Sequence, residues 1–78
     1  MNIIVDAIDL LEKGHVEQAD LELLRWLGHQ QVSVDDPTWC AASDAAQLIH
    51  PLGKPKQALT VLRKELERQK QGESENES

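Results

Sequence analysis

The stretch Gly53-Lys54-Pro55-Lys56-Gln57-Ala58-Leu59 separates two segments whose apolar residues have helical spacing. An earlier stretch, Gly14-His15-Val16-Glu17-Gln18-Ala19, repeats its pattern, with a glycine five residues before an alanine and a glutamine directly before that alanine. A glycine at such a junction adopts a left-handed conformation without strain and so ends one helix. The small alanine, one turn into the next helix, lets two helices approach closely. Each copy therefore predicts a helix, a tight turn and a second helix.

The composition predicts one small, all-α domain. The chain has 78 residues, 40% of them hydrophobic, and contains no Phe or Tyr. Abundant Leu, Glu and Gln, with no strand-like alternation, favour helices. We interpret Trp26 and Trp39 as bulky fillers of an otherwise aliphatic core. The alternative is that one of them is an exposed anchor for a partner, with Trp39 the better candidate because it stands near a helix start.

Apolar periodicity places four helices along the chain. The first covers about residues 2–13, and its apolar residues form two adjoining stripes that span about 160° of the helix surface. The second covers about residues 16–28. Its apolar side consists of Ala19, Leu23, Trp26 and Leu27, widened by Val16, Leu24 and Leu21. The third begins at Asp36, a side chain suited to the N-cap, followed by Pro37 at the first helical position, and it ends near Ile49. The fourth begins at Pro55 in the same way.

The chain is acidic overall, but its charge is uneven. The net charge is −6, and residues 1–53 carry nine acidic against two basic side chains. Residues 54–70 carry six basic against two acidic side chains, whereas residues 72–78 are acidic and contain no apolar residue. A segment of that composition does not repay its ordering entropy. We therefore expect a helical domain over residues 1–71 and a disordered acidic tail over residues 72–78.

Cysteine usage and hydropathy predict a cytoplasmic protein. Cys40 is the one cysteine, so the chain forms no internal disulfide. The first residues lack the basic leader of a signal peptide. No apolar run approaches the ~18 residues that a membrane-spanning helix needs.

The residue spacing predicts neither a metal site nor a cofactor. Cys40 and His50 lie ten residues apart on one predicted helix, a rise of ~15 Å, and His15 and His29 flank opposite ends of another. No pair of cysteines or histidines has the spacing of a zinc site. The acidic side chains of the first helix are interpreted as solubilising charge, because acid–base catalysis needs carboxylates in contrasting environments. The chain is not predicted to be an enzyme.

The two copies resemble tetratricopeptide (TPR) repeats over about residues 2–69. They stand 39 residues apart, against ~34 in that family, and a longer connector over residues 28–36 accounts for the excess. Asp6 and Glu65 occupy positions that are usually apolar or small in the family, and neither copy closes with the usual proline. The further matching positions are Ala7, Leu10, Leu23, Ala45, Ala46, Ile49 and Leu62.

The resemblance implies two stacked helical hairpins, made of four antiparallel helices, with a groove lined by the first helix of each hairpin. The groove residues that it implies to bind a partner are Ile4, Ile8, Leu11 and Glu12 from the first copy and Ser43, Gln47 and His50 from the second. The implied function is protein–protein contact. We predict a chaperone or adaptor that holds a helical or aggregation-prone partner, similar in size, charge and fold to bacterial type III secretion chaperones.

Two alternatives belong to other classes. One is a structural homodimerisation module without a client. The other is a nucleic-acid-associated regulator that uses the basic fourth helix, although the chain lacks the basic domain and the stacking aromatic residues of that class.

The first helix leads to a prediction about association. The second helix can bury only one of its two apolar stripes, so we expect a monomer to expose Ile4, Ile8 and Leu11 as a patch of several hundred Å². The protein is then expected to form a homodimer, or to bind a partner's helix, through that patch.

Overall fold

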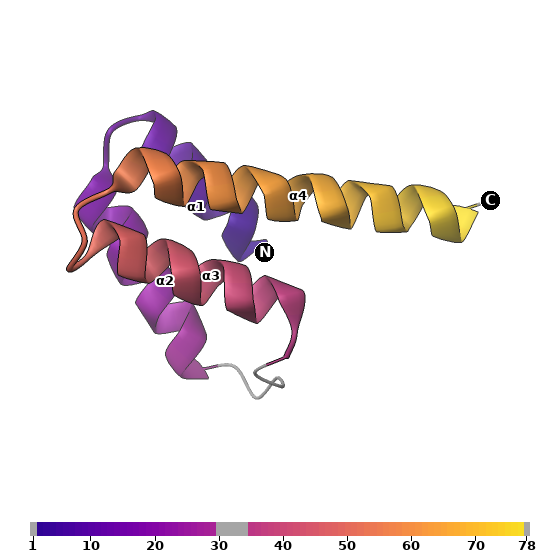
Figure 1. Ribbon diagram of the computed structural model, residues 1–78, viewed down its shortest axis with the longest axis horizontal. Helices are drawn as coiled ribbons and strands as arrows, with labels where there is room; N and C mark the ends of the chain where they lie inside the picture. Colours follow the sequence, from indigo (N-terminus) through magenta and orange to yellow (C-terminus); the bar gives the residue numbers. More distant parts are fainter. Residues whose placement is uncertain (1, 30–34, 78) are drawn as a thin grey trace.

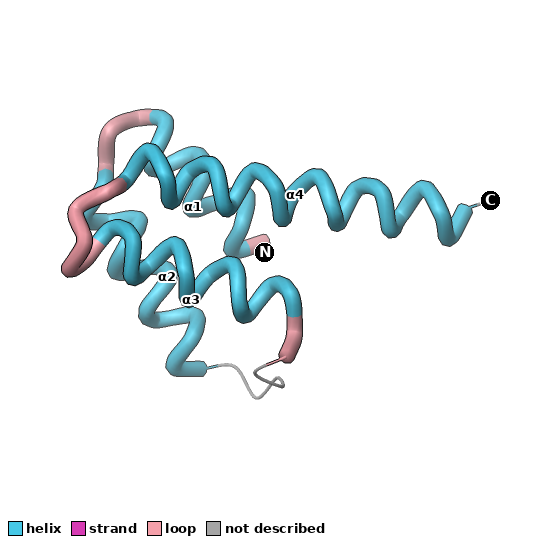
Figure 2. Tube along the Cα trace, in the orientation of Figure 1, coloured by secondary structure: helices cyan, strands magenta, loops and turns pink. Residues whose placement is uncertain are grey.

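The fold was obtained as a computed structural model that describes residues 2–29 and 35–77, with side chains described as far as residue 71. It consists of α1 (Ile3–Glu12), α2 (Val16–His29), α3 (Pro37–Ile49) and α4 (Pro55–Glu77). Figures 1 and 2 show these helices joined by loops, without a strand among the described residues. The prediction of an all-α fold is confirmed. None of the described helices combines the length and the hydropathy that crossing a membrane requires.

The helices form a closed ring of contacts. α1 packs against α2, α2 against α3, and α3 against α4, and α4 returns to contact α1. α1 and α3 make little direct contact. In Figure 1, α3 and α4 lie side by side and run in opposite directions, and α4 extends past the other helices towards the C-terminus. α1 therefore has a packed neighbour on two sides.

Gly14 ends α1 in the conformation that the sequence predicts. Its φ is 83°, in the left-handed region. Its N–H donates to the carbonyl of Leu11 at 3.1 Å, and the N–H of His15 donates to the carbonyl of Leu10 at 2.8 Å. These two bonds define a Schellman motif, which satisfies carbonyls at the helix end and reverses the chain.

Gly53 likewise adopts a left-handed conformation in the turn between α3 and α4. Its φ is 65°, and its N–H donates to the carbonyl of Ile49 at 3.1 Å. The N–H of Lys54 reaches the carbonyl of Leu48 at 2.6 Å, so the turn is one residue wider than that after α1. Pro55 then opens α4. The predicted left-handed glycine is confirmed at both turns.

Side-chain caps define the starts of α1 and α3. Asp36 Oδ1 accepts from the N–H of Thr38 at 2.9 Å and from that of Trp39 at 3.1 Å, which confirms the predicted N-cap. Asn2 caps α1 by accepting from the N–H of Ile4 at 3.0 Å. α2 continues through Gly28 to His29, and most of the predicted connector lies outside the described residues.

The core is aliphatic and draws on all four helices. Its largest fully buried side chains are Ile4, Leu23 and Leu62. The two repeat alanines, Ala19 and Ala58, are also fully buried at the positions where helices pack. Both tryptophans are only half-buried, and Trp26 packs against the core from its edge. The other buried hydrophobic residues are Ile3, Ala7, Ile8, Leu11, Ala41, Ala42, Ala45, Ala46 and Ile49.

The last helix is longer than the sequence pattern predicts. Its bounds extend to Glu77, through most of the segment 72–78 that we expect to be a disordered tail. Leu66 is the last apolar residue on α4, so the final turns carry no apolar side chain that could pack against the bundle. Disorder of residues 72–78 in solution stays a prediction.

Candidate functional site

The apolar half of the predicted groove lies in the core. Ile4, Ile8 and Leu11 are 0%, 7% and 8% exposed, so the prediction that a monomer exposes them as a patch is wrong. The prediction assumed that α2 alone covers α1. In the structure α4 packs against the other side of α1, and together the two helices cover both apolar stripes. These three side chains stabilise the fold and offer no surface to a partner.

Glu12, the fourth residue of that half, reaches the surface but has a partner within the chain. Arg63 Nη2 lies 2.8 Å from Glu12 Oε2, and about half of each side chain is exposed. Exposed pairs of this kind contribute ~0–1 kcal/mol to stability. The pair joins the end of α1 to α4, so Glu12 belongs to the contact that closes the ring.

The other half of the predicted groove faces away from the first. Ser43 is half-buried, whereas Gln47 and His50 are exposed. At 100° per residue, Ser43 and Gln47 lie about 160° from Ala45, which is fully buried. The outer side of α3 thus carries Ser43 and Gln47, while Ile4 and its neighbours on α1 are buried in the core. The structure does not bring the two predicted halves together.

Exposed leucines mark a different surface, on α2. Leu21 is 62% exposed and Leu24, one turn further on, is 51% exposed. Leu21 borders a hollow of ≈ 420 Å³ between the first turns of α2 and the end of α3. We name this feature the α2–α3 hollow, and its lining residues are Val16, Glu17, Asp20, Leu21, Ile49 and His50. It includes one residue of the predicted groove, His50.

The α2–α3 hollow and a hollow along α4 are lined by different residue types. Another hollow, of ≈ 470 Å³, lies along α4, but its lining is entirely polar or charged: Thr60, Arg63, Lys64, Glu67, Arg68 and Gln71. The lining of the α2–α3 hollow instead includes the aliphatic residues Val16 and Ile49 and the exposed Leu21. That combination is typical of a site that receives an apolar side chain from another molecule.

The interpretation of the sequence placed Leu21 and Leu24 on the inward side of the second helix. The helical wheel already argued against this, because Leu21 lies about 160° from Leu23. Leu23 is fully buried, so Leu21 has to point outward. The sequence signal for an exposed leucine is that the apolar residues of α2 span too wide an arc of the helix to fit on one buried face.

Asp20 adds an unusual polar feature to the same hollow. Its Oδ1 is shielded from solvent and has no hydrogen-bond partner among the described residues. A buried acceptor without a donor costs ~1–3 kcal/mol. Glu17, one turn earlier, lines the hollow beside it and is exposed. The hollow therefore offers two carboxylates, one of them lacking a donor for a buried oxygen.

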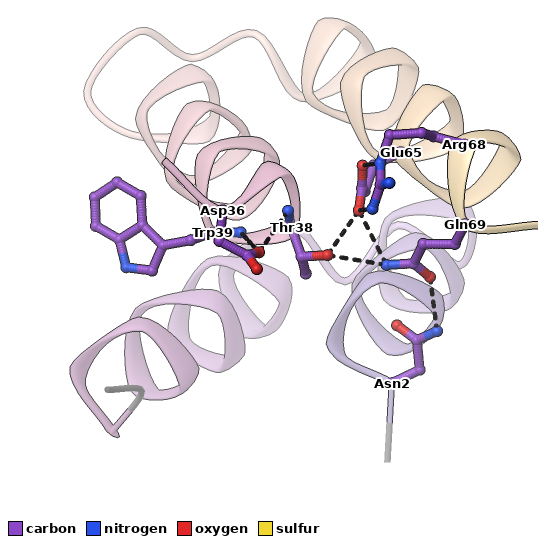
Figure 3. A network of polar contacts seen from close by, with 7 residues as sticks. All are labelled: Asn2, Asp36, Thr38, Trp39, Glu65, Arg68 and Gln69. Atoms are coloured by element: carbon purple, nitrogen blue, oxygen red, sulfur yellow. Dashed lines mark hydrogen bonds and ion pairs between the residues drawn. The ribbon is translucent and has the colours of Figure 1, made fainter. Parts of the chain in front are cut away.

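A second cluster of polar side chains lies where the starts of α1 and α3 meet α4 (Figure 3). Its centre is Glu65, which is only 6% exposed. Arg68 donates to both carboxylate oxygens, from Nε at 2.7 Å and from Nη2 at 2.9 Å. Thr38 Oγ1 donates to Glu65 Oε2 at 2.7 Å, and Gln69 Nε2 donates to the same oxygen at 3.1 Å. Asn2 Nδ2 donates to Gln69 Oε1 at 3.1 Å, which connects α1 to the cluster.

These contacts determine the protonation of Glu65. The hydrogen bonds from Arg68 lower the pKa of its carboxyl most strongly, burial opposes them, and Thr38 and Gln69 lower the pKa further. The net result is a lowered pKa, so the carboxylate stays ionised and has its acceptor sites filled. It is unsuited to accept a proton from a substrate. Glu65 therefore connects α4 to α3 through Thr38.

Trp39 lies beside this cluster without joining it through its side chain. Its backbone N–H donates to Asp36, while its indole extends away from the hydrogen-bonded side chains (Figure 3). Within the described residues, no group of three or more His, Cys, Asp and Glu side chains is arranged to hold a metal ion.

No family model matches the chain, and no match is found among curated proteins or solved structures. The functional argument therefore rests on the two features described above, the α2–α3 hollow and the Glu65 cluster. The resemblance to TPR repeats and to secretion chaperones stays a prediction.

Proposed function

We propose that the protein is a small interaction module that binds another protein through the α2–α3 hollow. The observation that carries this proposal is the exposure of Leu21, at 62%, on the rim of a hollow with Val16 and Ile49 in its lining. Fully burying a leucine side chain contributes ~1.5–3 kcal/mol. A partner that covers Leu21 and Leu24 gains this contribution without unfolding any part of the domain.

Within this class we retain a chaperone or adaptor in the cytoplasm, without enzymatic activity, as the proposed role. Two helix pairs, each joined by a left-handed glycine, support a TPR-like pairing into hairpins. The contact between α1 and α4 fills the side on which the resemblance places a groove. The proposed binding surface therefore moves to α2 and α3.

Replacing the exposed leucines tests this proposal, because the replacement should weaken binding of the partner. Tagged wild-type protein, expressed in its native host, should co-purify with a stoichiometric partner that mass spectrometry identifies. Reconstituted with the purified partner, Leu21→Asp/Leu24→Asp should bind at least ~100-fold more weakly by calorimetry, a loss of about 2.7 kcal/mol. Val5→Asp is the control, because Val5 is 44% exposed but lies on α1 and does not line the hollow. A double variant that keeps full affinity would refute the proposal.

The nucleic-acid alternative is weakened by the ion pairs of α4. Arg63 pairs with Glu12 at 2.8 Å, and Arg68 pairs with Glu65 at 2.7 Å. Two of the six cations that the sequence places over residues 54–70 are therefore already engaged.

A further inference from the structure

We infer that, when no client is bound, the α2–α3 hollow is occupied by the α3–α4 turn of a second copy of this chain, in a two-fold symmetric dimer. This inference rests on the proposed function only in using the same surface. It adds that the turn of a second copy occupies the hollow in the resting state, so a client has to displace that turn.

The acceptor side is the α2–α3 hollow, which is acidic and apolar. Glu17 and Asp20 line it, and no lysine or arginine among the described residues does. The two basic side chains among residues 1–53 are engaged elsewhere, since Lys13 pairs with Asp9 at 3.0 Å and Arg25 with Glu22 at 3.7 Å. Asp20 Oδ1 is shielded from solvent and has no hydrogen-bond partner among the described residues.

The donor side is the turn itself, which is basic and apolar. Leu52 is 55% exposed there, and Lys54 and Lys56 follow it with exposed side chains. Among the described residues neither lysine has an ion-pair partner. The turn therefore presents two kinds of group that complement the α2–α3 hollow, an apolar side chain to pack against its aliphatic residues and cations to pair with its carboxylates.

The two sides adjoin each other on the molecule, which is what a two-fold dimer requires. His50 lines the hollow, and Leu52 follows it by two residues. The turn before α2 and the turn before α4 lie at the same end of the molecule (Figure 1). In a symmetric interface the same patch on both copies is self-complementary, so each contact forms twice. A two-fold axis near His50 places Leu52 of each copy at Leu21 of the other, and Lys54 and Lys56 opposite Asp20 and Glu17.

Other exposed surfaces of a second copy fit less well. The outer face of α4 carries Lys56, Thr60, Lys64 and Glu67, which supply cations but no apolar side chain. Val5 on α1 is 44% exposed, but the nearest charged residues along its helix are the acidic Asp6 and Asp9. Among the exposed large hydrophobic residues of the described part of the chain, Leu52 is the one with two lysines close by in the sequence.

Sedimentation velocity on the purified chain tests the dimer without any client. Wild-type protein at several hundred micromolar should sediment as a dimer and dissociate on dilution. Lys54→Glu/Lys56→Glu should raise the dissociation constant at least ~10-fold, and Glu17→Lys/Asp20→Lys should do the same, because each opposes like charges twice. Lys64→Glu/Lys70→Glu is the matched control, since it makes the same change in net charge on α4 away from the turn, and it should dimerise like wild type.

The decisive experiment mixes the two charge-reversed variants. Each repels its own copies, but together they restore both opposite-charge contacts, so a 1:1 heterodimer should form. Circular dichroism on each variant confirms that it is folded, and recovery on mixing excludes misfolding as the cause of dissociation. A monomeric wild type, reversed variants that stay dimeric, or a mixture that stays monomeric would each overturn the inference. None of these results depends on the client-binding experiment with Leu21 and Leu24, so the two proposals fail separately.

Discussion

At the scale of single residues, the contacts of Glu65 show how one buried charge is accommodated. Its donors come from α3 and α4, and Gln69 extends the cluster to Asn2 at the start of α1. Thr38 and Glu65 are 27 positions apart, and Asn2 and Gln69 are 67 apart. Sequence spacing identifies pairs within one helix, such as Glu65 and Arg68, but not partners brought together by tertiary packing. The sequence therefore shows that position 65 is charged, but it does not show that this charge connects helices.

We predict that Glu65→Gln destabilises the domain in a pH-dependent way. At pH 7 the variant should lose ~1–3 kcal/mol of unfolding free energy, because Arg68 loses its ionic partner. The folded state lowers the pKa of Glu65, so its contribution is complete above the pKa of the unfolded chain, ~4.3, and is lost as the pH falls through the lower, folded value. Urea unfolding of both proteins from pH 7 to pH 3 measures the difference, which should shrink below pH ~4. Glu67→Gln, an exposed neighbour, is the control and should change little.

At the scale of helices, local signals predicted most boundaries correctly. Asp36 with Pro37 and the glycines at positions 14 and 53 act through their own backbone, so the sequence contains what determines them. The faces of the helices were harder to predict. Whether the second apolar stripe of α1 is exposed depends on where α4 packs, and no residue of α1 encodes that contact. Four helices are therefore predicted correctly, whereas Ile4, Ile8 and Leu11 of the predicted binding surface lie on a buried face.

Replacing Gly53 in the α3–α4 turn should lower the unfolding free energy, whereas replacing Gly28 within α2 should not. Gly53→Val should lower the unfolding free energy by ~1 kcal/mol or more, because a β-branched residue is strained at a φ of 65°. Apart from its chain neighbours, no described residue comes within 4 Å of the Cβ position, so the loss comes from the local backbone conformation rather than from a clash with packed side chains. Gly28 also has open space around its Cβ position but is helical without a positive φ. Gly28→Ala should leave stability unchanged or raise it, and urea denaturation of both variants makes the comparison. A neutral Gly53→Val would contradict the role of the turn.

At the scale of the whole molecule, the contact of α4 with α1 decides the architecture. A stacked repeat places each unit beside the next and leaves the ends open. Here the first and last helices close on each other, through buried aliphatic residues and the pair between Glu12 and Arg63. Repeat spacing in the sequence carries no information about such closure, which is why the expected open groove was misplaced.

The projecting end of α4 should be dispensable. Deleting residues 72–78 should leave the helicity of the domain core and its melting temperature nearly unchanged, because this segment contains no apolar residue. Thermal unfolding followed by circular dichroism measures both, with deletion of residues 66–78 as a positive control that removes Leu66 and Gln69. A loss of several degrees for the shorter deletion would mean that the acidic segment docks on the domain.

The closed ring also bears on how the molecule comes apart. In linear repeat arrays each unit contacts only its neighbours, so a terminal unit can open while the rest stays folded. Because α1 rests on both α2 and α4, opening either hairpin removes support from the other. Amide hydrogens in α1 and in the packed turns of α4 should therefore exchange with solvent through one shared, global opening. The domain then unfolds as a single cooperative unit.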